Sequence, residues 1–598
     1  MRRAPAIVAC LLAALALAPS ALAGSRARDL RVATTTRIDT LNPLTGTLAA
    51  EYRVWALNYD ILVGFDQKSM APDETHSLAA SWKPSKDGLT WTYTLRPNLQ
   101  WSDGAPLTAH DVVFTMDFLK RRVRSSALEA VKSWRATDDT TVVAHLSHRS
   151  VEMKSLWIYI LPQHVWKAAD NKRWASFVPP LPLVGSGPYT VTSWNPNGTT
   201  VMERNPYFRE WSKGGLRDNN DGPERVLMTY YGDSRAAVTD LEQNRLDVLP
   251  SDTLDGPDVK RLERTSGVHV YHSPAIGLEY WVFDLAPSVT RRVHKSVVQS
   301  KAIRQALAWA IDRTKLVQAS LLGYGAPGNT QLSRNYGDYT LDLSSDPVLG
   351  YKYNPRHARE ILDAAGWRVG PGGIRRRNGV RAAFELAYGG GTSEKRAVTL
   401  IRAWARDVGI AIDARIYDFD KLTALEFNKV KGKRKPDFDS ELWSIGGDPT
   451  PEFLLSLFTR AQLGTWNDSG WVNETYERLF RQETRASDTA ARVDDIKRLQ
   501  RLAVANLPYI ELYEPDDLSA VNTRRWRNWT TQPSPDGQPI SSYGFSTIVA
   551  LKPGELTSRS YPGVPWALGA LVVLAALGLG SSLIAHRREQ REPIEIAA

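Results

Sequence analysis

A run of 22 residues without a charged side chain, 564–585, lies close to the C-terminus. At a rise of about 1.5 Å per residue, a helix of this length crosses the roughly 30 Å hydrocarbon layer of a membrane. His586, Arg587 and Arg588 follow directly, and such charges mark the cytoplasmic side. A buried helix of a water-soluble domain would carry a polar face, which this run lacks. The sequence therefore predicts one transmembrane helix, a cytoplasmic tail over 586–598, and everything before the helix outside the cell.

The N-terminus has the three parts of a secretory signal. Met1-Arg2-Arg3 precedes an apolar stretch, and an Ala-x-Ala site ends at Ala23, so we expect residues 1–23 to be removed as a signal peptide. The one cysteine of the chain, Cys10, lies inside this signal. The alternative is that Cys10 is a lipid-acylation site, but the apolar stretch that precedes it would then be too short to direct export. The mature chain then has no cysteine, which excludes disulfides, cysteine-ligated zinc and iron–sulfur clusters.

The segment between these ends is long enough for several structural units. The chain has 598 residues, of which 42% are hydrophobic and 23% are charged, and this balance disfavours disordered and polytopic membrane proteins. A length of roughly 150 residues per domain allows about four units. The net charge of +10 is spread over a large chain, which is weak evidence for nucleic-acid binding. We therefore expect no nucleic-acid partner.

Local patterns predict a mixture of strands and helices. Alternating aromatic and β-branched residues over 91–95 are typical of a strand, and Thr108 with Asp111 matches the capping box of a helix. Asn378-Gly379 predicts a tight hairpin. Apolar spacing and cap residues predict further helices over 301–322, 355–366, 474–482 and 489–505. The sequence therefore predicts a protein that contains both strands and helices.

Motifs for bond chemistry are absent from the sequence. It contains no nucleophile elbow, no His-Glu-x-x-His helix and no phosphate-binding Gly-x-x-x-x-Gly-Lys loop. His145 and His148, like His269 and His272, are three residues apart in predicted strands. The members of each pair would face opposite sides of a sheet, which makes a poor metal fork. We expect no catalytic residue, no metal and no cofactor.

Eight short motifs follow one another in a set order over nearly 300 residues. They are Leu78-Ala-Ala-Ser-Trp82, the segment Asp87–Arg96, Trp101-Ser-Asp-Gly104, the segment Leu107–Phe114, Gly185-Ser-Gly-Pro-Tyr189, Arg204-Asn-Pro-Tyr207, the segment Arg304–Arg313, and Tyr353-Asn-Pro355 through Ala364-Ala-Gly-Trp367. In this order the motifs resemble the family 5 extracellular solute-binding proteins. That family includes the oligopeptide- and dipeptide-binding receptors of ABC importers.

The resemblance implies an α/β fold of two hinged lobes, the class II periplasmic-binding-protein-like fold, with an extra subdomain inserted in the first lobe. A solute would be enclosed between the lobes when the hinge closes. Carried over by order along the chain, the expected units are lobe I over 29–62, 184–273 and 509–551, the extra subdomain over 63–183, lobe II over 274–508, and a tether to the membrane over 552–563.

The segment Trp443-Ser-Ile-Gly-Gly-Asp-Pro449 resembles the family's cleft segment. Trp443 offers a stacking face, Gly446 and Gly447 allow close approach of backbone, and Asp448 can accept hydrogen bonds from a cation. The alternative is an ordinary strand-to-helix turn. Peptide-binding relatives place an acidic residue three positions after the tryptophan, where this chain has Gly446. Either Asp448 replaces that acid or the solute lacks a free amine, and the sequence leaves both open.

Three further segments are candidates for contact with the solute. Tyr388 and Gly389 begin a glycine loop before a helix, which could present backbone N–H groups to an anion; a plain flexible loop is the alternative. Tyr280 and Trp281 are adjacent in a predicted strand, so they point to opposite faces and one of them belongs to the core. The remaining pair is Glu51 and Tyr52, near the end of the first strand.

The resemblance implies a receptor that captures an extracellular peptide or peptide-like solute and passes it to the permease and ATPase subunits of an ABC importer. It would be a single-pass protein of a bacterial cell membrane, with its large domain outside the cell. A membrane-anchored sensor that signals through a partner is an alternative. A cell-surface hydrolase is a third possibility, which no motif supports.

Overall fold

The computed structural model describes most of the segment between the two apolar ends. It covers residues 28–558 except for gaps at 76, 124–127, 172, 209, 213–214, 218–221, 252, 255, 287–295, 427–428, 431–432 and 435–437. The expected signal peptide, transmembrane run and cytoplasmic tail lie outside these residues. Within the described part of the chain, no helix combines the length and apolar character needed to cross a membrane.

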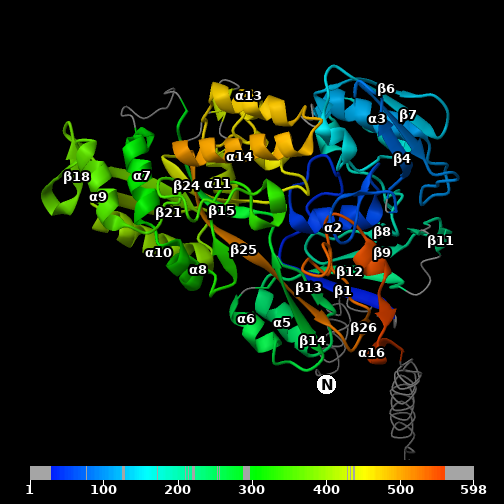
Figure 1. Ribbon diagram of the computed structural model, residues 1–598. Helices are drawn as coiled ribbons and strands as arrows, with labels where there is room; N and C mark the ends of the chain where they lie inside the picture. Colours follow the sequence, from blue (N-terminus) through cyan, green and yellow to red (C-terminus); the bar gives the residue numbers. More distant parts are fainter. Residues whose placement is uncertain are drawn as a thin grey trace, which may run out of the picture.

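One twelve-stranded mixed sheet runs through the molecule (Figure 1). Ten strands follow the order β21 (Ala411–Ile416), β20 (Ala383–Tyr388), β24 (Ser440–Ile445), β15 (Leu278–Phe283), β25 (Tyr509–Asn522), β13 (Val248–Leu249), β1 (Asp29–Thr34), β12 (Arg225–Tyr230), β9 (Thr199–Arg204) and β8 (Tyr189–Ser193). Two more, β14 (Val268–Pro274) and β16 (Gly325–Pro327), pair with β25 off this path.

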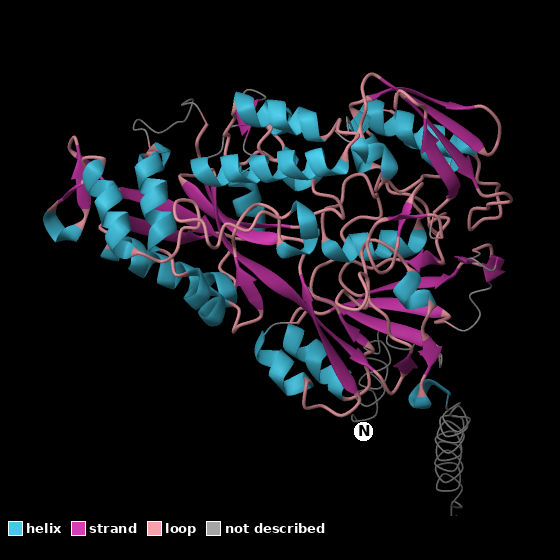
Figure 2. Cartoon of the chain, in the orientation of Figure 1, coloured by secondary structure: helices cyan, strands magenta, loops and turns pink. Residues whose placement is uncertain are grey.

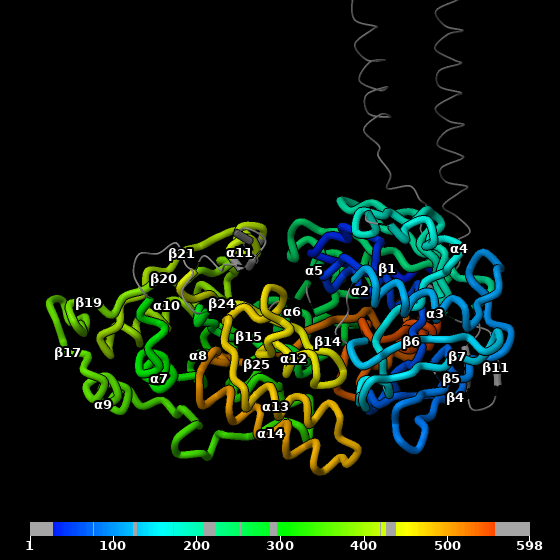
Figure 3. The backbone as a smooth tube through the Cα atoms, turned by 90° about the horizontal axis from the view of Figure 1, so that it is seen from above, coloured from blue at the N-terminus to red at the C-terminus, as the bar shows by residue number. Residues whose placement is uncertain are grey.

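The 14-residue strand β25 belongs to both halves of this sheet. Its first residues pair antiparallel with β15, and its later residues pair with β14 and β13. The chain crosses between the halves a second time where β14 leads into β15. The backbone N–H of Ala275 in this crossing donates to the carbonyl of Pro515 in β25, at 3.2 Å. Two adjacent backbone segments thus connect two lobes, as a hinge requires, and the lobes lie side by side in Figure 3.

Lobe I has its own core and carries a smaller unit. Its core contains α2 (Ala49–Asn58) with the fully buried Trp55. The smaller unit is a four-stranded antiparallel sheet, covered by α3 (Ala109–Phe118). Its strands are β4 (Ala79–Pro84), β5 (Thr90–Leu95), β7 (Thr141–Leu146) and β6 (Val131–Ala136). The predicted capping box of α3 is confirmed, because Asp111 accepts from the N–H of Thr108 at 2.9 Å.

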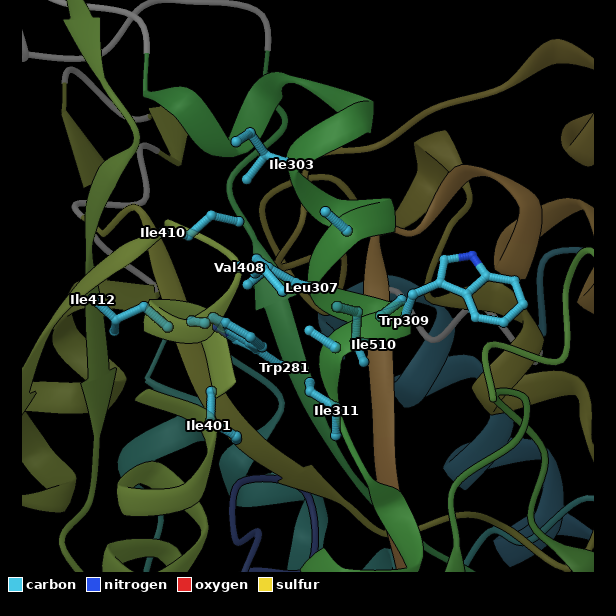
Figure 4. Close-up of a cluster of buried hydrophobic side chains, with 14 of the residues drawn as sticks. Trp281, Ile303, Leu307, Trp309, Ile311, Ile401, Val408, Ile410, Ile412 and Ile510 are labelled. Carbon is cyan, nitrogen blue, oxygen red and sulfur yellow. The ribbon is translucent and has the colours of Figure 1, made fainter. Parts of the chain in front are cut away.

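Helices cover both faces of the sheet in lobe II (Figure 2). One core lies under α7 (Lys301–Ala310), α8 (Arg313–Ser320), α9 (Pro355–Ala364) and α10 (Thr392–Asp407). Figure 4 shows part of this core, in which Leu307 and Val408 approach Trp281. The other core lies under α12 (Glu452–Ser456), α13 (Glu474–Glu483) and α14 (Thr489–Asn506). The expected domain boundaries stay predictions.

Local expectations are mostly confirmed in this lobe. α13 and α14 match the predicted ranges, and Asn378 and Gly379 have the positive φ angles of a tight hairpin. The single helix predicted over 301–322 is wrong. The backbone is extended at Ile311, and the side chain of Asp312 caps a new helix by accepting from the N–H of Lys315 at 2.9 Å. A short polar residue has interrupted an otherwise continuous apolar pattern.

Candidate functional site

The two lobes touch along a seam. Away from the hinge, two hydrogen bonds between described residues cross it. Tyr543 of lobe I donates its hydroxyl to the carbonyl of Gly447 in lobe II at 2.9 Å. The backbone N–H of Val151, in the extra subdomain, donates to the carbonyl of Thr484 at 2.9 Å. Both acceptors lie in lobe II, so the molecule is in a closed arrangement. The candidate site is the part of this seam around Gly447.

The segment 446–448 leaves the end of β24 and turns into the seam. A β-carbon on Gly447 would lie 2.1 Å from the hydroxyl of Tyr336, whereas a β-carbon on Gly446 would meet nothing within 4 Å. Tyr336 uses that hydroxyl to donate to the carbonyl of Asp448 at 2.8 Å. Glycine at 447 thus permits a close approach that fixes Asp448, while a side chain at Gly446 would enter open space.

Asp448 is the predicted site residue with the most perturbed environment. Burial raises the pKa of its carboxyl to about 7. Its charge in turn contributes to the raised pKa values of Tyr52, Tyr336 and Tyr543, after the larger effect of burial on each hydroxyl. Residues from both lobes therefore surround one carboxyl group. Such a group is either protonated or in need of a positive partner.

Three aromatic rings of lobe I pack together, and the charge of Asp448 acts on two of them, Tyr52 and Tyr543. Tyr52 lies 5.3 Å from Trp157, and Trp157 lies 4.9 Å from Tyr543, between ring centroids. All three are partly buried around the lobe I core. We call Tyr52, Trp157 and Tyr543 the aromatic wall. Because ring faces attract cations and pack against apolar groups, the wall and Asp448 together suit an amino group attached to a partly apolar solute.

A second acidic group lies farther along the seam. Glu152, in the 3-10 turn Val151–Lys154 of the subdomain, has its pKa raised to about 7, first by burial and then by Asp448. In lobe II, Arg492 of α14 forms ion pairs with the buried Glu452 and Glu483. Arg492 also counteracts the rise in the pKa of Glu152. In the closed arrangement the carboxyl of Glu152 therefore lies near Arg492, which already forms ion pairs with two glutamates of lobe II.

The residues predicted in β15 lie in the two cores of lobe II. Tyr280 and Trp281 do point to opposite faces, but both are at most 1% exposed. Tyr280 donates its hydroxyl to Asp468 at 2.8 Å. Trp443 is partly buried, and it packs against the core under α12–α14 and against a small cluster with Leu422. Of these rings, Trp443 keeps some exposed surface.

The glycine loop before α10 already has an anionic partner. Glu394 in the first turn of α10 accepts from the N–H of Gly391 at 2.8 Å. Gly389 is exposed, and Tyr388 is buried in the core beneath the loop. The N–H groups expected to bind an anion from solution are thus partly occupied by a carboxylate of the same helix. A solute anion would have to displace Glu394 at this position.

The carboxylate of Glu51 is likewise already bound by backbone N–H groups of the protein. Its carboxylate accepts from the N–H groups of Thr40 and Leu48, at 3.1 and 3.0 Å, and the residue is 1% exposed. It ties the loop before α2 to the helix that positions Tyr52.

The structure brings three of the predicted site residues together: Tyr52, Gly447 and Asp448. It adds four that the sequence did not single out: Glu152, Trp157, Tyr336 and Tyr543. Among the described residues, no group of His, Cys, Asp or Glu forms a metal cluster.

Comparison with known proteins agrees with this architecture. Residues 75–464 match the model of the bacterial extracellular solute-binding proteins, family 5 Middle. The chain belongs to this family. One relative of this family 5 protein is Protein XP55 of Streptomyces lividans, 28% identical over 76% of this chain and 78% of the relative. The predicted resemblance is confirmed.

Solved structures share the fold of the family 5 protein. The oligopeptide-binding protein AppA of Bacillus subtilis, in complex with a nonapeptide, is 20% identical with a TM-score of 0.73, covering 88% of this chain and 99% of AppA. NikZ of Campylobacter jejuni, in complex with Ni(L-His), is 18% identical with a TM-score of 0.72, covering 88% of this chain and 100% of NikZ. The two-lobed α/β fold is therefore confirmed.

Proposed function

We propose that this family 5 protein is the substrate-binding receptor of an ABC importer and captures a peptide or peptide-like solute outside the cell. Closure of the lobes would enclose the solute, and the closed shape would be recognised by permease subunits. ATP hydrolysis would occur on separate ATPase subunits, and the receptor itself would perform no bond chemistry. The observation that carries the proposal is the carboxyl of Asp448, held in the seam opposite the aromatic wall.

An amino group of the solute would supply a positively charged partner for the carboxylate of Asp448. The family's acidic position is Gly446 here, and open space surrounds it. Asp448 lies two residues farther along, fixed by Tyr336. A solute amine placed between Asp448 and the ring of Tyr52 or Tyr543 would gain an ion pair and a cation–π contact. The peptides and peptide-like solutes that we propose carry such amines.

We also propose that the run 564–585 anchors the receptor in the membrane. A tether of about ten residues reaches at most roughly 35 Å, so the two lobes would stay close to the membrane surface. Tethering raises the effective concentration of a binding protein near its partner. The receptor would therefore meet its permease more often than a freely diffusing protein would.

Native mass spectrometry of the full chain, purified in detergent, tests this function. A bound mass that fragments into amino-acid residues supports a peptide receptor, and a bound mass of any other kind refutes that solute class. Once a solute is known, Trp443→Ala should weaken its binding while the fold is kept, and unchanged affinity would remove Trp443 from the site. Asp448→Asn should weaken amine-bearing solutes selectively, whereas Asp494→Asn on the exposed face of α14 should have no effect.

A further inference from the structure

A small cavity lies in lobe I, and Tyr543 of the aromatic wall is part of its lining. Its lining includes Tyr59, Asp60, Tyr159, Gln532 and Tyr543. The cavity measures about 20 Å³, and roughly 10–15 Å³ is the minimum for one water-sized group. An ammonium group is similar in size to a water molecule and fits this space. The cavity therefore has room for a small polar group.

The first polar group of the cavity is the carboxyl of Asp60. The backbone N–H of Asp60 donates to the hydroxyl of Ser186 at 3.0 Å, and the same serine hydrogen-bonds the carboxyl. Burial raises the pKa of Asp60 to about 7. No charged neighbour contributes to that shift. Within the described part of the chain, Asp60 is thus a partly buried carboxyl without a cationic partner.

The second polar group is the side-chain oxygen of Gln532. Gln532 is 4% exposed, and this oxygen makes no hydrogen bond. The backbone of Gln532 is held firmly, because it exchanges two hydrogen bonds with Gln538, at 3.0 and 3.1 Å. An unpaired buried acceptor destabilises the folded chain, because it has lost its hydrogen bonds to water. A donor placed in the cavity would remove that destabilisation.

These contacts define the chemistry of the occupant. Asp60 and Gln532 both accept hydrogen bonds, and aromatic rings, including those of Tyr59 and Tyr159, line the same space. A carboxylate, an amide oxygen and ring faces all favour a positively charged donor. We propose that this cavity binds one primary ammonium group, either as the free ammonium ion or as the end of an alkylammonium chain. The site does not depend on the solute of the seam being a peptide.

The position of Tyr543 connects this cavity to the seam. Its ring lines the cavity, and its hydroxyl donates to Gly447 of lobe II. An occupant of the cavity therefore lies against the residue that bonds the two lobes. An alkylammonium chain entering from the seam would have to pass the ring of Tyr543, whereas the free ion needs less room. The two sources of ammonium can accordingly be separated by experiment.

The test uses the full chain in detergent with ¹⁵N-labelled ammonium chloride, at constant ionic strength set with sodium chloride. We expect saturable binding, seen as transfer of magnetisation from protein protons to ammonium. Asp60→Asn keeps the shape of the side chain and should weaken binding by about tenfold or more, because it removes a charge-assisted hydrogen bond. The matched control is Asp536→Asn, on the exposed part of the segment that carries Gln532.

Each outcome decides the proposal. If n-butylammonium chloride competes with ammonium, the cavity accepts the end of an alkylammonium chain. If ammonium binds and n-butylammonium does not compete, the site is specific for the free ion. Either result supports the proposal when Asp60→Asn weakens binding and Asp536→Asn does not. Absence of saturable ammonium binding, meaning that the cavity holds ordered water only, overturns it. Binding that Asp60→Asn leaves unchanged overturns it as well.

Discussion

The hydrogen bond between Tyr543 and Gly447 provides a direct measure of how the closed lobes are held. Replacing Tyr543 by Phe removes the hydroxyl and keeps the ring that packs on Trp157 at 4.9 Å. A neutral hydrogen bond contributes about 1 kcal/mol net, which corresponds to about a fivefold change in an equilibrium. We therefore expect the ratio of closed to open molecules to fall about fivefold. A solute that binds only the closed form should lose affinity by up to the same factor.

Single-molecule fluorescence transfer between the lobes measures this ratio. The single cysteine of the chain lies in the expected signal peptide, so two labels can be introduced without competing thiols. Lys132 in the subdomain and Ser487 in lobe II are exposed. The control is Tyr353→Phe, at a tyrosine of lobe II that is 48% exposed. An equal closed fraction in the wild type and in Tyr543→Phe would refute the view that this bond holds the lobes together.

Three further perturbations test the local geometry. Gly447→Ala forces a β-carbon against Tyr336 and should lower the free energy of unfolding by about 1–3 kcal/mol, whereas Gly446→Ala should be neutral; equal denaturation midpoints would contradict the close approach. The pKa of Asp448 is about 7 in the folded chain against an ordinary value of 3.8, so its contribution is present below about pH 4 and is lost as the pH rises through 7. Chemical denaturation should show a decline in stability with pH over that window, and the decline should be smaller in Asp448→Asn; identical pH profiles would exclude the effect. Glu51→Gln should cost about 1–3 kcal/mol, because two backbone N–H groups lose a charged acceptor, and an unchanged melting temperature would refute that role.

The sequence singled out the segment around which the candidate site is built, because that information is local. A tryptophan, two glycines and an aspartate within six residues indicate a backbone that approaches another group closely, and Gly447 does so. Tyr543 is 96 residues away from Gly447 along the chain, in a stretch without periodic pattern. Its partner is determined by how β25 returns the chain to lobe I. No spacing rule connects two such positions.

Tyr280 and Trp281 show where a correct pattern gives an incomplete answer. Alternation along a strand correctly placed the two rings on opposite faces. It could not indicate that helices cover both faces of this sheet, which depends on α12–α14 packing from far along the chain. The same limit applies to Gly391, whose N–H is taken by Glu394 three residues later. That glutamate is a capping signal in the sequence, and it argues against an open anion site.

The carboxyl groups of the seam determine which charge it accepts. Burial raises the pKa of Asp448 and of Glu152 to about 7 each, and the charge of Asp448 adds to the rise at Glu152. Two ionised carboxylates are therefore disfavoured in the seam. Arg492 is shared among Glu152 and the two glutamates that it already pairs with. A proton can neutralise the seam at low pH. At neutral pH an amine of the proposed solute would do so at less cost, since it would add hydrogen bonds and ring contacts that a proton cannot supply. Under the proposed function, specificity for an amine would therefore arise from the carboxyl groups of Asp448 and Glu152 in the closed seam.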